Sequence, residues 1–385
     1  MKVIVVGAGI LGASVARSLA ATGADVQLLD RWGPGTGATA TTFSWVNSNR
    51  KIQPGYFRLN VAGMAEHAKL AEELNGPRSY FRSGSVHCAD ARNEPWLVDN
   101  VELLRARDYP ARWVGRAEAA RIAGEIRIPD STTAIAHFPG EGYVLPDRLL
   151  RNLLDDARRR GAEISTGEVV AVDETPGGSA VTLATGEVRA ADRIVLATGR
   201  WTDELAARSG LDIPMMTEIE QGSPIIGLLG YATVPEAGLR CVVHTPSLNL
   251  RPAAHGKTVV QALDLNAEVD PARPPSTDGE IGRAIARRFA DLLPAPPPEI
   301  ELRVAIRSMP ADGYTIAGFT SAHSRVYALV THSGITLAPL LGRLAAAEIT
   351  DDETSDLLRT FRPTRFAGLP RSELVVNRPT RLGEQ

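Results

Sequence analysis

The first thirty residues constrain the fold of this chain more than any other stretch. Residues 3–6 are all apolar, as expected of a parallel strand buried on both faces. Gly7, Gly9 and Gly12 follow at once and give the spacing G-x-G-x-x-G. In a strand–turn–helix, such glycines permit the tight turn, the close approach of a pyrophosphate and the packing of helix on strand.

A second strand and an acidic residue complete this pattern. Helical spacing continues to Gly23, which we expect just beyond the helix C-terminus, and residues 26–29 form a second apolar run. Asp30 ends that run, where a carboxylate can accept hydrogen bonds from an adenosine ribose. The stretch therefore predicts a dinucleotide site, and the alternative is a glycine-rich turn that binds nothing.

Composition limits the partners. The chain has 385 residues, a net charge of −3 and 44% hydrophobic residues, which is ordinary for a globular protein with two or three domains of core. Such a charge balance argues against nucleic-acid and membrane surfaces. Cys88 and Cys241 stand far apart, so we expect neither a disulfide framework nor a metal site. With a first strand that leaves no room for a signal peptide, this predicts a cytoplasmic protein.

The strand–glycine–helix theme returns later in the chain. Residues 193–199 are a mostly apolar run that ends in Gly199 before a predicted helix. Residues 326–330 are another apolar run, followed by Thr-His-Ser-Gly and a helix predicted over 335–349. Between these units, alternating short segments over 80–140 and 215–304 are typical of hairpin strands. A plain Rossmann dehydrogenase would instead continue with further βαβ units.

Taken together, these stretches resemble the D-amino-acid oxidase superfamily of FAD proteins, which includes glycine oxidase and sarcosine oxidase. The motifs that carry the resemblance follow one another in family order: 3–12 with Asp30, 37–39, 142–146, 194–201, and 303–318 with 331–343. The resemblance implies an α/β fold. A Rossmann-like FAD-binding domain would be joined to an α+β substrate domain, whose large mixed or antiparallel sheet covers the flavin.

The implied domains alternate along the chain. We expect the FAD-binding domain in 1–80, 142–214 and 305–366, the substrate domain in 81–141 and 215–304, and a C-terminal tail in 367–385.

The resemblance implies FAD as a non-covalent cofactor. Sarcosine oxidase-like members attach FAD through a cysteine, and Ala305 stands at about that position here. The residues expected to contact FAD belong to the glycine turns, the loops after the strands and the start of the last long helix. They are Gly7, Gly9, Ile10, Leu11, Gly12, Asp30, Arg31, Gly37, Ala38, Thr39, Ser44, Val169, Ala197, Thr198, Gly199, Trp201, Arg307, His332, Ser333, Gly334, Ile335 and Thr336.

Arg307 is the first candidate for catalysis, because the arginine at the matching family position grips a substrate carboxylate. A guanidinium does this bidentately, and the alternative for Arg307 is an ordinary ion pair. His244 and Arg251 on the expected roof sheet and Lys51 near the cofactor loop are further candidates, each with a structural role as the alternative. The implied reaction is oxidation of a D-amino acid, glycine derivative or secondary amine to an imine, by hydride transfer to flavin N5.

The electron acceptor is expected to be O2, with another acceptor as the alternative. Sarcosine oxidase-like members activate oxygen with a lysine in the roof sheet, and the matching stretch 258–261 has none. An FAD-dependent amine dehydrogenase is therefore the rival enzyme. A non-catalytic flavin-binding or assembly subunit is the alternative from another class of protein.

Overall fold

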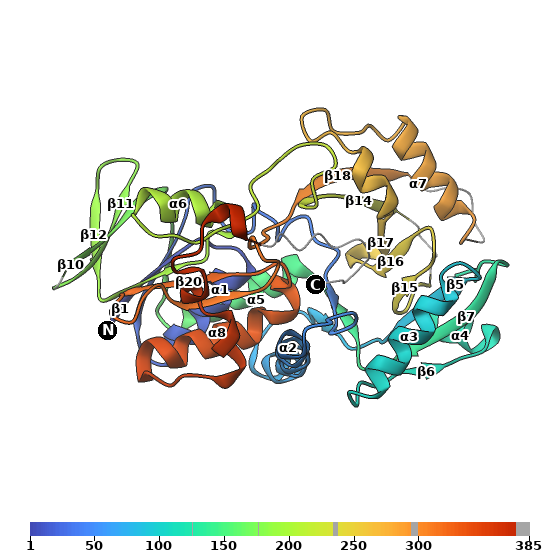
Figure 1. Ribbon diagram of the computed structural model, residues 1–385, viewed down its shortest axis with the longest axis horizontal. Coiled ribbons are helices and arrows are strands. Elements are labelled where there is room, and N and C mark those ends of the chain that lie inside the picture. The colour runs from blue at the N-terminus through green and yellow to red at the C-terminus, as the bar shows by residue number, and fades with distance from the viewer. Residues whose placement is uncertain (125, 176, 234–237, 294–298, 375–385) are drawn as a thin grey trace.

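Two large β-sheets divide the computed structural model, which describes residues 1–124, 126–175, 177–233, 238–293 and 299–374. Figure 1 shows them as two halves side by side, with a six-stranded sheet in one and an eight-stranded sheet in the other. Of the predicted tail 367–385, residues 375–385 lie outside the described part of the chain.

The six-stranded sheet has the order β19-β20-β13-β1-β2-β9. Its neighbours pair in parallel except for the edge strand β19, which pairs antiparallel with β20. The apolar runs predicted as buried strands all lie in it, because a strand covered on both faces needs apolar side chains throughout. The strands are β1 (Lys2–Val6), β2 (Asp25–Asp30), β9 (Glu163–Thr166), β13 (Arg193–Leu196), β19 (Ile316–Phe319) and β20 (Val326–Val330).

Helices cover this sheet through close contacts between small residues. Helix α1 (Ile10–Ala21) packs between α5 (Pro146–Arg159) and α8 (Gly334–Asp351). A Cβ atom placed on Gly342 of α8 would come within 2.7 Å of the carbonyl oxygen of Ser14 on α1. Helix α2 (Pro54–Glu73) also packs on α8, and a Cβ atom on its Gly63 would come within 2.7 Å of the carbonyl oxygen of Thr336. Glycine at such contacts lets the two helices lie closer together than a residue with a Cβ atom would allow.

The eight-stranded sheet forms the second half, with the order β18-β14-β17-β16-β15-β5-β7-β6. Only the β5–β15 pair is parallel among the strand pairs described here. One face is apolar and packs beneath α4 (Arg116–Ala123) and α7 (Glu280–Ala290). The strands are β5 (Ser85–Asp90), β6 (Arg112–Trp113), β7 (Thr132–Phe138), β14 (Ile226–Thr233), β15 (Val242–His244), β16 (Asn249–Pro252), β17 (Lys257–Gln261) and β18 (Ile300–Ile306).

Two small antiparallel sheets and two further helices complete the described fold. One sheet lies at the far end of the first half in Figure 1 and contains β10 (Val169–Thr175), β11 (Gly178–Leu183) and β12 (Val188–Ala191). The other contains β3 (Trp45–Val46), β4 (Tyr80–Phe81) and β8 (Gly142–Val144) and lies at the junction of the halves. The helices are α3 (Glu94–Arg105) and α6 (Thr202–Arg208).

The predicted α/β fold class is confirmed, with local differences. In the segment 215–304, where hairpin strands are expected, the first strand begins only at Ile226, and β19 was not predicted as a strand. Strand β18 runs to Ile306, two residues past the expected end of a domain segment at 304, and the division into domains stays a prediction. Within the described residues, no helix is long and apolar enough to cross a membrane.

Substituting Gly12 by alanine should destabilise the β1–α1 unit. The new Cβ would come within 1.8 Å of the carbonyl oxygen of Gly7, so backbone must move. We expect Gly12→Ala to lower the free energy of unfolding by about 3 kcal/mol, the upper end of the range for overpacking. Gly115→Ala is the control, because a Cβ there meets nothing within 4 Å. Equal urea midpoints for the two variants would contradict this packing argument.

Candidate active site

A cavity of about 490 Å³ lies between the two halves of the molecule. On one side it is lined by the β1–α1 turn, the loop after β2, the turn after β13 and the start of α8. On the other side it is lined by β14, the end of β17 and the end of β18. The cavity therefore meets the carboxyl ends of the parallel strands, where ligands bind in open α/β sheets.

The β1–α1 turn is shaped for close approach of a ligand. Gly7 has φ +101°, and a Cβ atom on it would lie 2.5 Å from the carbonyl oxygen of Ala197. A Cβ on Gly9 would meet only Thr39 Oγ1, at 3.4 Å, so Gly9 leaves space on the cavity side. Gly12 was predicted to bind the cofactor, but it does not line the cavity and instead packs on Gly7.

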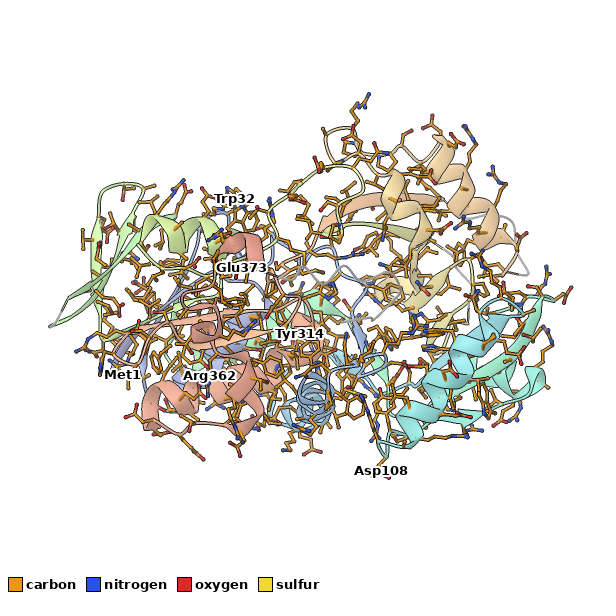
Figure 2. All side chains as sticks on the ribbon, viewed as in Figure 1. Met1, Trp32, Asp108, Tyr314, Arg362 and Glu373 are labelled. Atoms are coloured by element: carbon orange, nitrogen blue, oxygen red, sulfur yellow. The ribbon has the colours of Figure 1, made fainter. Side chains whose placement is uncertain are left out.

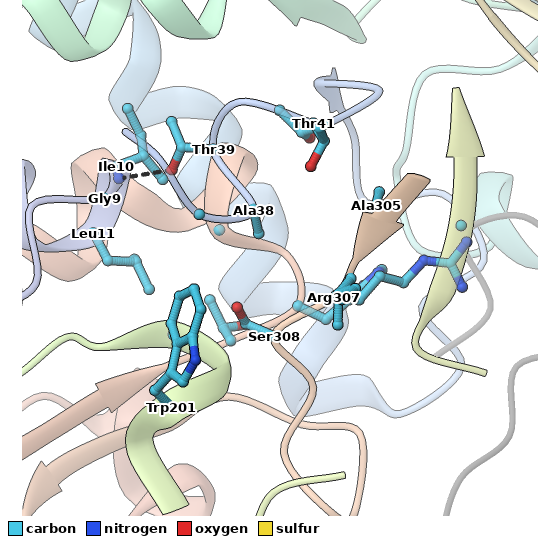
Figure 3. A pocket seen from close by; sticks show the side chains of 18 of the residues that line it. Gly9, Ile10, Leu11, Ala38, Thr39, Thr41, Trp201, Ala305, Arg307 and Ser308 are labelled. Carbon is cyan, nitrogen blue, oxygen red and sulfur yellow. Dashed lines mark hydrogen bonds between the residues drawn. The ribbon is translucent and has the colours of Figure 1, made fainter. Parts of the chain in front are cut away.

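Two hydrogen-bonding side chains fix this turn. The Asp30 carboxylate accepts from the backbone N–H of Ala8 at 2.8 Å and from that of Trp32 at 3.0 Å. Thr39 Oγ1 accepts from the N–H of Ile10 at 3.1 Å, the bond drawn in Figure 3. Helix α1 thus begins at the cavity with no acidic residue in its first turn, and its N-terminal N–H groups favour an anion there.

A stack of aromatic and cationic side chains forms the outer end of the cavity. The Arg31 guanidinium lies 3.7 Å from the ring centroid of Trp32 and 4.2 Å from that of Trp201. Trp32 is 59% exposed and lies at the surface of the molecule, as Figure 2 shows. A Cβ on Gly37 would come 3.4 Å from the Trp201 ring. These flat faces are suited to an aromatic base.

The N-terminus of α8 opens into the same cavity. Ser333 precedes this helix without a side-chain capping bond, and its first turn contains no acidic residue. The Ser333 hydroxyl accepts from Tyr56 OH at 2.9 Å. Gly334 and Thr336 line the cavity. The partial positive charge of this helix end can stabilise negative charge on a bound group.

The segment 44–51, called here the inner wall, separates the start of α8 from the eight-stranded sheet. Its Trp45, Asn47 and Lys51 side chains line the cavity. Asn47 Oδ1 is buried and has no hydrogen-bond partner among the described residues. A buried acceptor without a donor is costly, so this atom fits a ligand that carries an N–H group.

Lys51 is the buried cation of the inner wall, with a side chain only 4% exposed. Burial, with a smaller contribution from Arg50, lowers the pKa of Lys51 to about 7. Its ammonium lies 5.6 Å from the ring centroid of Tyr56. Lys51 can therefore exchange a proton near neutral pH.

Arg307 lies at the end of the cavity opposite Trp201 (Figure 3). One guanidinium nitrogen donates to the carbonyl of Pro224 at 2.6 Å, and no acidic side chain of the described residues pairs with Arg307. Another guanidinium nitrogen lies 3.2 Å from where a Cβ of Gly227 would be, so a glycine makes room for it. Burial lowers the pKa of Arg307 to about 10, which leaves it cationic at neutral pH.

Two predicted catalytic residues lie outside the cavity lining. Arg251, in β16 of the eight-stranded sheet, donates to the backbone carbonyls of Phe43 and Pro252. The bond to Phe43 connects this sheet to the segment before the inner wall. His244 Nδ1 lies 2.8 Å from Asn249 Oδ1, and its ring centroid lies 4.4 Å from that of Trp45. Both side chains support the cavity from behind, and a direct catalytic contact does not follow from this placement.

The other predicted site residues all line the cavity, and their individual roles stay predictions. They are Gly7, Gly9, Ile10, Leu11, Asp30, Arg31, Gly37, Ala38, Thr39, Ser44, Lys51, Val169, Ala197, Thr198, Gly199, Trp201, Arg307, His332, Ser333, Gly334, Ile335 and Thr336. Sequence reasoning missed Gln261 in the lining and Glu141 directly behind it, because neither stands in a glycine turn or a recognisable motif.

Comparison with known proteins agrees with this architecture. The family model "DAO: FAD dependent oxidoreductase" matches residues 2–348. Glycine oxidase of Geobacillus kaustophilus is 24% identical over 382 residues, which cover 95% of this chain and 97% of the enzyme. The uncharacterized oxidoreductase YurR of Bacillus subtilis is 25% identical over 375 residues, covering 94% of this chain and 98% of YurR.

Solved structures share the fold. The crystal structure of the Geobacillus kaustophilus glycine oxidase matches with a TM-score of 0.80 and 22% identity, covering 94% of this chain and 99% of that one. L-proline dehydrogenase from P. horikoshii matches with a TM-score of 0.79 and 18% identity, covering 95% and 97%.

The chain belongs to the FAD-dependent oxidoreductases of the D-amino-acid oxidase superfamily. It is an enzyme of that family, and its cofactor is FAD. The described cavity fits this cofactor, since helix N-termini open at two places, aromatic faces stand at one end and Asn47 offers an unpaired buried acceptor.

Lys51 should make stability depend on pH. With its folded pKa at about 7 and its ordinary value near 10.5, the folded chain binds one proton fewer than the unfolded chain between these pH values. Stability should therefore rise with pH across this window, by up to about 1.4 kcal/mol per pH unit. Lys51→Met should remove that rise in urea titrations from pH 7 to 10 at a fixed cofactor content.

The exposed Lys257 provides the control for this titration. Lys257→Met should keep the wild-type dependence on pH. A wild-type slope in Lys51→Met would mean that Lys51 stays charged in the folded protein.

Proposed function

We propose that this enzyme oxidises an amino acid or related amine that carries a carboxylate, and that FAD is held without a covalent bond. The observation that carries the proposal is the cavity-lining guanidinium of Arg307, which has no acidic partner among the described residues. Burying a cation is unfavourable unless it is paired, so this position fits an anionic ligand group.

The charges of the cavity support this substrate class. Its acidic lining residues, Asp30, Glu168 and Glu204, belong to segments around the Trp201 end, where the adenosine of FAD would bind. Among the described residues, Lys51 and Arg307 are the charged groups of the opposite end. A carboxylate is attracted there, while an ammonium group finds no carboxylate to pair with.

Each part of the chain has a distinct task in this proposal. Bound FAD supplies the acceptor for a hydride equivalent. The α1 N-terminus and Gly9 would hold its pyrophosphate, and the N-terminus of α8 would stabilise negative charge at its flavin end. Arg307 would orient the substrate by its carboxylate, and Lys51 would take or return a proton at the amine.

Non-covalent attachment is supported by the positions of the cysteines. Cys88 and Cys241 are both buried, and neither lines the cavity. Ala305 lines it, at about the position where the resemblance places the cysteine of sarcosine oxidase-like members. Trichloroacetic acid should therefore release all the flavin from the precipitated protein.

O2 is the proposed electron acceptor, and a dehydrogenase is the rival. Strand β17 presents Gln261 rather than a lysine to the cavity, which favours the dehydrogenase. Lys51 lines the cavity from the opposite side and could supply the positive charge that oxygen reduction needs. Hydrogen peroxide formed in an amount equal to the substrate consumed would support the oxidase. Flavin that is bleached by substrate but reoxidised only by an added quinone would support the dehydrogenase.

Arg307→Lys should weaken turnover of carboxylate substrates selectively. The test mixes the FAD-bound enzyme anaerobically with glycine, sarcosine, D- and L-amino acids and amines without a carboxylate, and follows bleaching of the flavin. Losing a bidentate contact should lower kcat/KM for carboxylate substrates by about 10- to 100-fold, the equivalent of a charge-assisted hydrogen bond.

Arg303→Lys is the matched control, on the strand β18 that ends just before Arg307. Arg303 pairs with Glu301 at 2.7 Å and does not line the cavity, so kcat/KM should stay within about twofold. Equal losses for substrates with and without a carboxylate would contradict the carboxylate clamp. A wild-type flavin that none of these compounds bleaches would contradict the proposed substrate class.

A further inference from the structure

A fully buried carboxylate, Glu141, lies directly behind the inner wall. It is the first residue after Gly140 in the turn between β7 and β8. Four side-chain donors from three segments of the chain converge on its two oxygens. They are Trp45 Nε1 at 2.9 Å, Asn49 Nδ2 at 3.0 Å, Tyr109 OH at 2.8 Å and Ser85 Oγ.

Two of these donors belong to the inner wall itself. Trp45 lines the cavity, and Asn49 stands two residues before Lys51. The wall begins at Ser44 with φ 57° and reaches Arg50 with φ 62°, left-handed conformations that side chains other than glycine rarely adopt. Such backbone persists only where its surroundings hold it in place. Glu141 binds the side chains next to both of these residues, those of Trp45 and Asn49.

We propose that Glu141 is a positioning residue for the reaction at the flavin, acting through Trp45 and Asn49 on the inner wall. This proposal rests on the proposed function. By binding the Trp45 indole and the Asn49 amide, Glu141 sets the depth at which Trp45 and Lys51 enter the substrate end of the cavity. The contact is indirect, since Glu141 itself does not line the cavity.

The number of donors explains why a carboxylate stands here. Burial raises the pKa of Glu141 to about 7, while the four hydrogen bonds favour the ionised form. Once ionised, the carboxylate offers about four acceptor sites, so all the donors named above can be satisfied at once. A glutamine has one acceptor oxygen and a donating NH2 group, so donors on one side would face another donor. Glu141→Gln therefore keeps the volume but breaks the pattern on which the wall depends.

Among the described residues, no lysine or arginine forms an ion pair with Glu141 that would replace these bonds. His87 Nε2 lies 3.9 Å from the carboxylate, and the His87 and His244 rings lie 4.3 Å apart. Burial lowers the pKa of both imidazoles below the ordinary value, to about 3 for His244, so both are neutral near pH 7. The positive charge of Arg50 on the inner wall lowers the pKa of His87 and His244 further. Burial raises the pKa of Tyr109, so its hydroxyl stays neutral and can donate.

The matched control is Glu348, another buried glutamate. It is 3% exposed and accepts hydrogen bonds from Tyr327 at 2.7 Å and from Arg362, but it does not line or support the cavity. Glu348→Gln should lower the melting temperature without changing the reaction. A loss of rate in Glu141→Gln alone would separate positioning from general stability.

The test uses FAD-bound wild type, Glu141→Gln, Glu348→Gln, Trp45→Phe and the double variant of Glu141 and Trp45. Glycine, sarcosine and D-alanine are the probes, and anaerobic bleaching of the flavin gives the limiting rate. Glu141→Gln should lower this rate by about 10- to 100-fold, as a misplacement near 1 Å does, with FAD affinity within about threefold. In the Trp45→Phe background the same substitution should cost less, because only the part of the effect that acts through Asn49 remains.

The visible circular dichroism of the bound flavin provides a readout that needs no substrate. Glu141→Gln should change this spectrum, and Glu348→Gln should leave it unchanged. If Glu141→Gln fails to fold, Glu141→Asp takes its place in the test. An unchanged rate and spectrum in Glu141→Gln, or an equal loss in both Trp45 backgrounds, would overturn the proposal. If none of the probes bleaches the wild-type flavin but the spectrum responds as expected, the proposed substrate class fails and the positioning role stands.

Discussion

The packing of α1 on α8 is the constraint on which the cofactor site depends. Both helices begin at the cavity, and both N-termini lack an acidic residue in the first turn. Gly342 of α8 lies so close to Ser14 of α1 that any larger side chain would push the helices apart. A rigid ligand that spans the two N-termini needs their separation fixed, and close-packed helices transmit any change in spacing rather than absorb it.

The second constraint is the junction between the sheets, where polar groups are buried. Arg251 reaches from the roof sheet to the carbonyl of Phe43, and Glu141 binds side chains from both sides of the junction. Each of these groups is costly to bury unless its hydrogen bonds are made. Directional hydrogen bonds, as well as apolar contacts, therefore fix the position of the eight-stranded sheet relative to the six-stranded sheet.

Features formed by contiguous residues could be predicted from the sequence, and features formed by residues far apart in the chain could not. The run at 326–330 coincides with β20, because a doubly covered strand is apolar along its whole length. The glycine turn after β1 was recognisable since its residues are contiguous. Strand β19 was missed because four residues on a sheet edge carry little pattern. Glu141 was missed because its partners stand 32 to 96 residues away.

The candidates outside the cavity lining show a further limit of sequence reasoning. Arg251 was a candidate for contact with the substrate, with a structural role as the alternative, since a cation on that sheet can face the cavity. The direction of the Arg251 guanidinium depends on which carbonyl oxygens lie near it. Here it donates to the carbonyls of Phe43 and Pro252 and does not line the cavity. Arg307 differs because Gly227 clears a space for its guanidinium beside the cavity. Arg251 in β16 and Arg307 just after β18 thus differ through the residues that surround them, and strand alternation alone cannot reveal that difference.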